Sequence, residues 1–150
     1  MVASVWIPLS AQLTPANEAD NEMVPALIYE LPTDARFVLG DLHYNAPNVR
    51  NVCEQTGRIL VTTEYGPYPH TDAGVEVQRI FHKLRSLAIE NFNEHFKGIF
   101  DGHGQVPAKG LIQTQRFASG AIFVYQLALL YRFQHDLDLN ICLKTFIKSM

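Results

Sequence analysis

Cysteine is scarce in this chain, and no stretch of it is long enough to cross a membrane. With only Cys53 and Cys142, the chain cannot have a framework of several disulfides. Both cysteines lie in apolar sequence, which predicts small buried thiols. The most apolar stretch, residues 117–131, is shorter than the roughly 18 residues that a membrane span needs and contains Ser119 and Gln126. We therefore interpret it as a buried helix.

A secretory leader is also missing from the sequence. Residues 1–13 lack the basic start and the small-residue cleavage site of a signal peptide, so we expect a cytoplasmic protein with no membrane partner. A chain of 150 residues, 47% of them hydrophobic, is long enough and apolar enough for one domain with a real core.

An overall excess of positive charge, the usual sign of nucleic-acid binding, is absent, because the net charge is -3. The charges are nevertheless unevenly distributed. Residues 1–75 hold three basic and nine acidic side chains, whereas residues 76–150 hold nine basic and six acidic ones. A polyanion would prefer the second half, and a chance asymmetry is the open alternative.

The first part of the chain is predicted to hold one strand and one helix. Residues 4–13 alternate loosely between apolar and polar types, which is typical of a strand. A helix follows, which Asp20 or Asn21 can cap and which the segment at residues 32–35 ends. Pro25 falls in its first two turns, where proline is tolerated best. The side chains expected to face inward are Met23, Leu27 and Ile28.

A strand–helix–strand unit is predicted next. Residues 36–40 form a short apolar run, typical of a strand buried on both faces. Residues 45–57 have the pattern of a helix, with Asn45 as its expected cap and Gly57 at its end. Residues 58–63 form the second strand. This order predicts a parallel pair with a helical crossover.

The second half is predicted to be mainly helical. A loop at residues 64–74 precedes a long helix over about 75–100, and two further helices are expected at about 114–134 and 138–149. Aromatic side chains in the first of these two are interpreted as core rather than as base-stacking platforms: Phe117, Phe123, Tyr125, Tyr131 and Phe133. Together the elements predict one α/β domain with a helical C-terminal third.

One face of the long helix carries charge. Its apolar stripe follows helical spacing and comprises Phe81, Leu84, Ala88, Phe92, Phe96 and Ile99. Glu90 falls roughly opposite this stripe, with Lys83 and Lys97 seven residues to either side. A solvated face with weak ion pairs is one interpretation of this column, and a cleft-facing Glu90 is the other.

Asp41 directly follows the apolar run that ends in Gly40. Its carboxylate could cap the turn or helix that follows. It could also bind a ligand, because open α/β sheets bind ligands outside the carboxyl ends of their strands. If the long helix carried Glu90 across that edge, the two carboxylates could hold Mg²⁺ or Mn²⁺, which prefer oxygen ligands. The residues themselves leave both interpretations open.

Four segments in this order give the chain a family resemblance: TPANEADN, FVLGDLHYN, LRSLAIENFNEHFKGIFD and KGLIQTQRFASGAIFVYQLALLYRF. Over nearly its whole length the chain resembles the DDE transposases of bacterial insertion sequences. The resemblance implies an RNase H-like fold in which three acids, Asp, Asp and Glu, bind two divalent ions, Mg²⁺ or Mn²⁺. These ions activate water, and then a DNA 3′-hydroxyl, for attack on phosphodiesters.

The resemblance assigns roles to particular residues. Asp41 matches the second acid and Glu90 the third, so both are implied as catalytic metal ligands. Lys97 matches the basic residue seven positions after that Glu, which implies contact with DNA phosphate. The implied partner is DNA, both the transposon ends and the target.

The chain departs from the family at two positions of the long helix. Many relatives have Tyr and Arg seven and four residues before the Glu, where this sequence has Lys83 and Ser86. Arg85 stands one residue away from the expected Arg. We therefore treat Lys83 and Arg85 as candidates for a different set of DNA contacts.

The family's first acid has no match in this sequence. It should lie on a strand that precedes residues 4–13, and the other early acids, Asp20 and Asp34, lie outside strands. We therefore expect an α/β, RNase H-like mixed sheet with flanking helices that lacks its first strand, together with the loss of an amino-terminal DNA-recognition region.

Residues 1–150 are accordingly interpreted as a partial DDE transposase catalytic domain that is weak or inactive alone. Two-metal geometry needs ions about 3.5–4 Å apart, and two of three carboxylates should support this poorly. The unpaired sheet edge predicts self-association or pairing with a full-length transposase. The alternatives are a non-catalytic remnant that binds DNA or pairs with a transposase, and a metal-dependent nuclease of the same fold.

Overall fold

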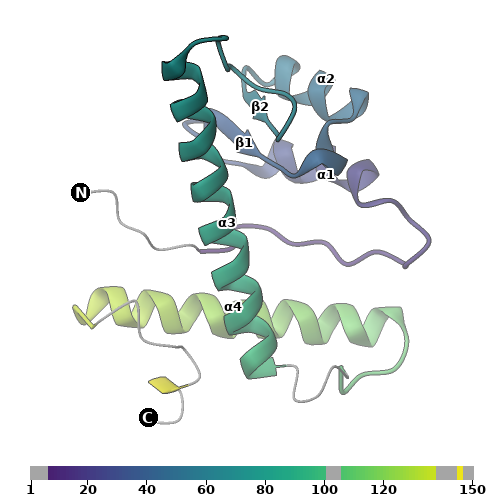
Figure 1. Cartoon of the computed structure of the whole chain (residues 1–150). Helices are drawn as coiled ribbons and strands as arrows, with labels where there is room; N and C mark the ends of the chain where they lie inside the picture. Colours follow the sequence, from purple (N-terminus) through teal and green to yellow (C-terminus); the bar gives the residue numbers. More distant parts are fainter. Residues whose placement is uncertain (1–6, 101–105, 138–144, 147–150) are drawn as a thin grey trace. The chain divides into compact units, whose positions relative to one another are not determined.

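The computed structural model describes residues 7–100, 106–137 and 145–146, except for the side chains of residues 91 and 97–100 (Figure 1). The chain divides into two compact units. One, here called the strand unit, comprises residues 14–87. The other, the helical unit, comprises residues 1–13 and 88–150. That residues 1–150 form one domain stays a prediction.

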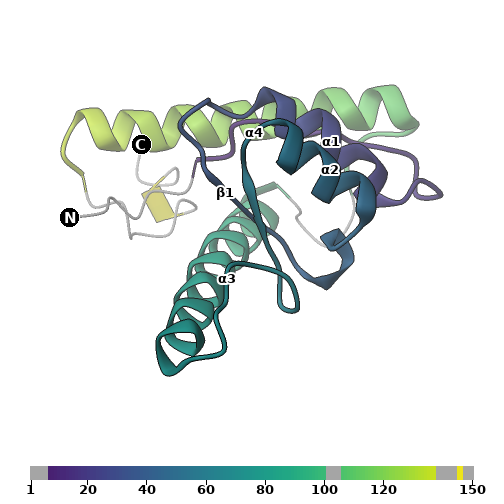
Figure 2. The ribbon, with the colours of Figure 1, turned by 90° about the horizontal axis from the view of Figure 1, so that it is seen from above.

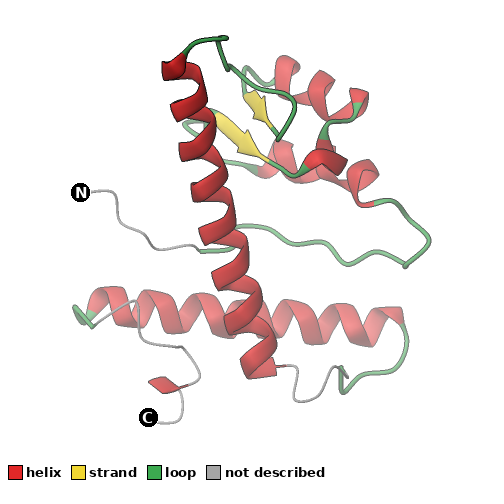
Figure 3. Cartoon of the chain, viewed as in Figure 1, coloured by secondary structure: helices red, strands yellow, loops and turns green. Residues whose placement is uncertain are grey.

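The strand unit is built around a β–α–β crossover (Figure 3). Strand β1 (Phe37–Leu39) pairs in parallel with β2 (Ile59–Val61), and Val38 lies in register with Leu60. Helix α2 (Pro47–Gln55) connects them, and α1 (Asp20–Glu30) precedes them. The predicted parallel pair with its crossover is confirmed. The described residues form a sheet of two strands, so the larger RNase H-like sheet stays a prediction.

Alternation along the two strands directs their side chains to opposite faces of the sheet. On one face, Val38 and Leu60 pack with α1 and α2 around the buried side chains of Ile28 and Val49. On the other face, the Phe37 ring lies 5.1 Å from the ring of Phe81 in α3 (Asp72–Phe100). Helices therefore cover both faces of the sheet, as Figures 1 and 2 show for this unit.

The strands are shorter and less buried than the sequence predicts. Each has three residues, and Phe37 and Ile59, at their first positions, are 45% and 43% exposed. The prediction that residues 36–40 are buried on both faces is therefore wrong at Phe37. Both exposed side chains lie at the amino ends of the strands, and Phe37 remains this exposed despite its contact with Phe81.

The helices of the strand unit begin without the predicted side-chain caps. Helix α1 follows Ala19, and neither Asp20 nor Asn21 occupies its N-cap position. Helix α2 follows Ala46 and starts at Pro47. Proline has no backbone N–H, and this costs nothing here because the first N–H groups of a helix have no acceptor within the helix. Asn45 instead accepts a hydrogen bond from Nε of Arg50 at 2.8 Å. Both capping predictions are thus wrong, because each helix follows an alanine and no side chain caps either one.

The ends of these helices agree better with the sequence. Gly57 has φ of +66°, a conformation that side chains with a Cβ rarely adopt, and it follows α2 directly. Pro25 lies in the second turn of α1, as expected.

Helix α3 begins at Asp72, three residues before the predicted start. At this start the Thr71 hydroxyl accepts the N–H of Gly74 at 3.2 Å.

The helical unit has its own small core. Helix α4 (Leu111–Gln134) contributes the buried Tyr125 and Leu129, which pack with Phe92 of α3 and with Ile7. The Phe92 and Tyr125 rings meet edge to face at 5.4 Å. The apolar stripe predicted on α3 is half-buried wherever its side chains are described. Cys53, in the strand unit, is buried as predicted, whereas Cys142 lies outside the described residues.

Residues 7–13 form no strand, so the strand predicted over 4–13 is wrong for the part that is described. Two glutamine side chains of α4 hold this segment: Gln115 donates to the Leu13 carbonyl at 2.9 Å, and Gln126 donates to the Pro8 carbonyl. Side chains thus satisfy carbonyls that a sheet would otherwise pair. The helix predicted at 138–149 lies largely outside the described residues.

Helix α4 is only partly buried, which corrects the prediction of a buried helix. Of its five aromatic residues expected in the core, Tyr125 is buried and Phe117 half-buried, whereas Phe123, Tyr131 and Phe133 are 59%, 44% and 64% exposed. Apolar side chains occur all around the helix, so the buried ones account for only part of its apolar surface. Among the residues that the structure describes, no helix has the length and hydropathy needed to cross a membrane.

Candidate functional site

Asp41 lies where the sequence places it, at the carboxyl end of β1 and directly after Gly40. It is the N-cap of a short 3₁₀ helix, η1 (Leu42–Tyr44), and its Oδ1 accepts the backbone N–H of His43 at 2.9 Å. The capping role is therefore present in the structure. A carboxylate has about four lone-pair sites, so one accepted hydrogen bond leaves others available for a ligand.

Gly40 fixes the position of Asp41 at the end of the strand. Its N–H donates to the Val61 carbonyl at 2.9 Å, which extends the pairing of the two strands by one residue. A Cβ on Gly40 would come within 2.9 Å of the Cβ of Tyr44, so the turn of η1 passes too close for any other residue. Asp41 is consequently held half-buried at the carboxyl edge of the sheet.

Thr62 directly follows β2, in the position that corresponds to Gly40 after β1, and the sequence analysis missed it. It is almost fully buried, its N–H donates to the Tyr65 carbonyl at 2.6 Å, and its Oγ1 accepts the Tyr65 N–H at 3.1 Å. The Tyr68 hydroxyl donates to the Thr62 carbonyl at 3.2 Å, and burial raises the pKa of Tyr68. A signal was available, because Thr62 is a polar residue at the end of the second apolar run, as Asp41 is at the end of the first.

Arg85 lies against the same edge. It lines a narrow gap together with Gly40, Thr62 and the neighbouring His82. Its Nε is buried, and no hydrogen-bond partner for that atom is found among the described residues. The one-residue offset from the family pattern thus places Arg85 beside the ends of both strands. Lys83, two residues earlier, is exposed.

A hollow of about 600 Å³ follows β2, between the loop at residues 63–72 and the first turns of α3. Its wall includes Glu64, His70 and Asp72, and Gln78 donates to the Thr63 carbonyl at 3.1 Å to hold one side. A space of this size could take a small polar ligand. The loop that the sequence treats only as a connection therefore shapes this edge of the sheet.

Asp41 also contributes to the electrostatics around η1. The pKa of Tyr44 is raised, first by burial of its hydroxyl and then by the negative charges of Asp20 and Asp41. The charge of Asp41 therefore acts on the Tyr44 hydroxyl of η1.

Glu90 and Lys97 belong to the helical unit, whereas Asp41, Lys83 and Arg85 belong to the strand unit. Glu90 is exposed on α3, and the side chain of Lys97 lies outside the described residues. A continuous α3 keeps positions 83, 90 and 97 on one face of the helix, because they are spaced by seven residues. The meeting of Asp41 with Glu90 stays a prediction.

A divalent metal ion needs several ligand side chains close together. Within the described parts of the chain, no group of three or more His, Cys, Asp or Glu side chains is arranged to hold a metal. Asp41 alone offers one hard oxygen ligand of the kind that Mg²⁺ and Mn²⁺ prefer. It fits as one ligand of a site whose other members have to come from elsewhere.

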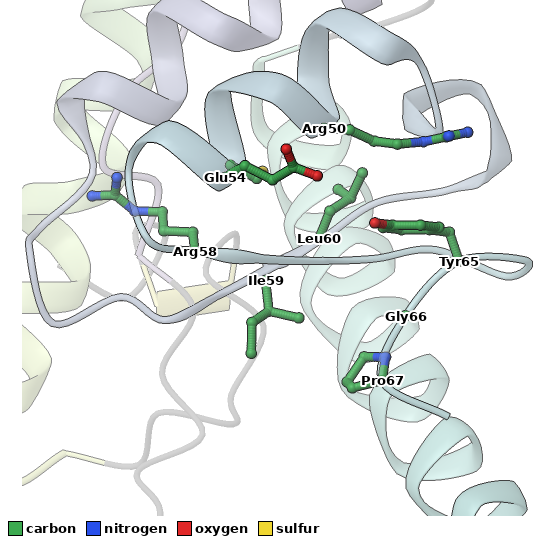
Figure 4. A pocket seen from close by; sticks show the side chains of 9 residues that line it. Arg50, Glu54, Arg58, Ile59, Leu60, Tyr65, Gly66 and Pro67 are labelled. Atoms are coloured by element: carbon green, nitrogen blue, oxygen red, sulfur yellow. The ribbon is translucent and has the colours of Figure 1, made fainter. Parts of the chain in front are cut away.

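A second pocket, of about 340 Å³, lies beside α2 and β2 (Figure 4). The guanidinium of Arg50 lies 4.9 Å from the ring of Tyr65, and Asn45 holds it through two hydrogen bonds. Arg58 donates to the carbonyls of Leu31 and Pro32 at 3.0 and 3.2 Å. Both arginines of this pocket therefore support the fold, and they offer less to a ligand than their charge suggests.

Comparison of the chain with models of protein families, with curated proteins and with solved structures finds no match.

Proposed function

We propose that this chain acts in DNA strand cleavage and transfer as part of a DDE transposase of a bacterial insertion sequence. The observation that carries the proposal is the position of Asp41, at the carboxyl end of the first strand of a parallel β–α–β unit. Ligands of open α/β sheets bind at this edge. The order of the four family-like segments along the sequence adds independent support.

In this proposal Asp41 and Glu90 hold Mg²⁺ or Mn²⁺, and Lys83, Arg85 and Lys97 bind DNA phosphate. The ion, when bound, would activate water and then a DNA 3′-hydroxyl for attack on a phosphodiester. The first acid of the family has no match in these 150 residues, so we expect slow turnover from this chain alone. The reaction would take place in the cytoplasm, on transposon ends and target DNA.

A DNA-binding measurement tests the proposal through Lys83, which is exposed on α3. We expect the chain to bind a labelled DNA duplex at low salt, with an affinity that falls as salt rises. Lys83→Gln should weaken binding to all sequences and reduce the slope of log K against log salt by about one, the value for one lost phosphate contact. Fluorescence anisotropy over a salt series measures both quantities.

Lys109→Gln is the matched control, because Lys109 is exposed too and lies outside α3. It should leave the salt slope unchanged. Absence of duplex binding at low salt would contradict the proposal. So would an equal loss in both variants, because that result indicates a general effect of charge rather than a contact made by α3.

A second candidate is a non-catalytic protein that binds DNA or pairs with a transposase. The observation that favours it is the hydrogen bond from the His43 N–H to Asp41, which gives this carboxylate a structural role without any metal. The two candidates differ in one property: only the first requires Asp41 and Glu90 to bind an ion together.

A further inference from the structure

Arg85 has no anionic partner in the part of the chain that the structure describes. Its Nε is buried and makes no hydrogen bond, and no hydrogen bond is found for its two Nη groups, which are not buried. The ion pair found among the described residues joins Arg79 to Glu76 instead. A guanidinium is always charged, and a charge that is partly removed from water is unfavourable without a partner. Arg85 therefore lacks the acceptor that its charge requires.

Two other arginines of the strand unit differ from Arg85 in this respect. Arg58 donates to two backbone carbonyls, at 3.0 and 3.2 Å. Arg50 donates to the side chain and to the carbonyl of Asn45, at 2.8 and 3.1 Å. Both guanidinium groups are thereby fixed as parts of the fold. The guanidinium of Arg85 is not fixed in this way, so its hydrogen-bond donors stay available to a ligand.

The backbone acceptors at the ends of the two strands are already engaged. The Val61 carbonyl accepts the N–H of Gly40 at 2.9 Å, and the Thr62 carbonyl accepts the Tyr68 hydroxyl at 3.2 Å. The described residues that line the gap beside Arg85 include no Asp or Glu. The acceptor for this guanidinium therefore has to come from a bound molecule.

His82 adds a second donor on the same side of α3. It lies three residues before Arg85, which makes the two side chains neighbours on the helix, and both line the gap. The imidazole carries one N–H when neutral and two when protonated. Phe81, next to His82, packs against the ring of Phe37 at 5.1 Å and so turns this face of α3 toward the sheet. Two donor side chains therefore meet at the ends of the strands.

We propose that Arg85 and His82 form a binding site for a single phosphate group at the carboxyl edge of the sheet. The planar guanidinium matches the oxygens of a phosphate, to which it donates two parallel hydrogen bonds. Open α/β sheets bind their ligands at this edge. Gly40 also lines the gap and Asp41 follows it directly, so the phosphate site lies close to the carboxylate that caps η1.

The phosphate site deepens the proposed function, and its connection with a metal ion rests on that function. Proteins commonly hold Mg²⁺ with one or two carboxylates together with phosphate oxygens of the substrate. The described residues contain no complete metal site, and Asp41 supplies a single carboxylate. A phosphate held by Arg85 supplies oxygen ligands that the chain lacks. Binding of the ion and binding of the phosphate should therefore strengthen each other.

Thermal unfolding of the full chain in inorganic phosphate, compared with chloride at equal ionic strength, tests the site. We expect a saturable rise in the Tm of the native chain. Arg85→Gln should weaken the apparent affinity at least about tenfold, because a charge-assisted contact is lost. Arg79→Gln is the matched control, since Arg79 is an exposed arginine of the same helix that pairs with Glu76, and it should keep the native affinity. General stabilisation by phosphate as a cosolute is common to all three proteins.

Arg85→Lys is a second variant, which decides the result if Arg85→Gln does not fold. Lysine keeps the charge but loses the planar pair of donors, so the affinity for phosphate should fall between those of the native chain and Arg85→Gln. A native chain without a saturable response overturns the proposal. An equal response in the native chain and the Arg85 variants also overturns it, because the guanidinium is then only solvated.

Two further measurements separate this site from the proposed function. A thymidine dinucleotide, which has one phosphodiester, replaces inorganic phosphate in the first. A response to both ligands supports the site and assigns it to a nucleic-acid backbone, whereas a response to inorganic phosphate alone supports the site and assigns it to a free phosphate or a monoester.

The second measurement adds Mg²⁺, which should tighten phosphate binding to the native chain and not to Asp41→Asn. Phosphate binding without this gain keeps the site and contradicts the shared ion of the proposed function. Binding of duplex DNA through Lys83 without phosphate binding at Arg85 overturns the phosphate site alone.

Discussion

The Asp41 carboxylate caps η1 and is also the candidate metal ligand. Its Oδ1 accepts the His43 N–H and so starts the turn that leaves β1, and the same position is where a sheet of this type binds ligands. The sequence predicted both roles and could not separate them, because a cap and a metal ligand use the same residue type. Only the hydrogen bond, a three-dimensional feature, shows that the cap is made.

We expect Asp41→Ala to lower the free energy of unfolding by about 1 kcal/mol, the usual loss when an N-cap side chain is removed. Asp41→Asn should lose much less, because an amide oxygen accepts the same hydrogen bond. Urea unfolding followed by circular dichroism measures both. Equal losses in the two variants would mean that the charge of Asp41, rather than its cap, stabilises the fold.

Thr62 was missed by the sequence analysis, and Arg85 was named only as a candidate DNA contact. Thr62 and Arg85 come together with Gly40 only once both strands and α3 are in place. Helical spacing gives the direction of Arg85 relative to other residues of α3, but not which element it faces. The sequence therefore did not predict that Arg85 lies at the ends of the two strands.

The secondary structure elements were predictable where local chemistry decides them. The β–α–β crossover follows from two apolar runs that flank a helix with Pro47 at its start and Gly57 after its end. Caps were harder to predict, because Asn45 bonds to Arg50 instead of the helix. The outward side of α4 was misjudged for a different reason: its sequence is as apolar as a core helix, and only tertiary packing shows which side is covered.

Two glycines should respond in opposite ways to replacement by alanine. Gly57→Ala should destabilise the chain by about 1 kcal/mol, because φ of +66° strains any residue with a Cβ. Gly120→Ala should stabilise it by up to about 1 kcal/mol, since it sits inside α4 with open space around it.

Thermal unfolding of the two glycine variants beside the native chain gives the sign of each change. A stabilising Gly57→Ala would show that α2 does not end as described. A destabilising Gly120→Ala would show that the space beside α4 is already filled.

The whole chain comprises two compact units that share helix α3, whose residues 72–87 belong to one and 88–100 to the other. This division separates the two acids that the family resemblance joins, since Asp41 and Glu90 lie in different units. Sequence order predicted the β–α–β crossover of the strand unit and the long helices α3 and α4, but the strand expected over 4–13 is not formed by residues 7–13. It could not predict how the carboxylates relate in space, because that depends on long-range packing rather than on local pattern.

The central claim, that Asp41 and Glu90 share a divalent ion, is tested most directly by thermal unfolding with and without Mn²⁺. The variants are Asp41→Asn, which keeps the cap, and Glu90→Gln, on an exposed helix face. Their matched controls are Asp34→Asn and Glu94→Gln, which replace exposed acids nearby in the sequence. A ligand at 100 times its dissociation constant stabilises by about 2.7 kcal/mol, so the native chain should gain several degrees in Tm.

The account predicts that both site variants lose this rise and that both controls keep it. A Mn²⁺ effect that is absent from the native chain, or equal in all five proteins, would contradict the shared ion and leave Asp41 as the cap of η1.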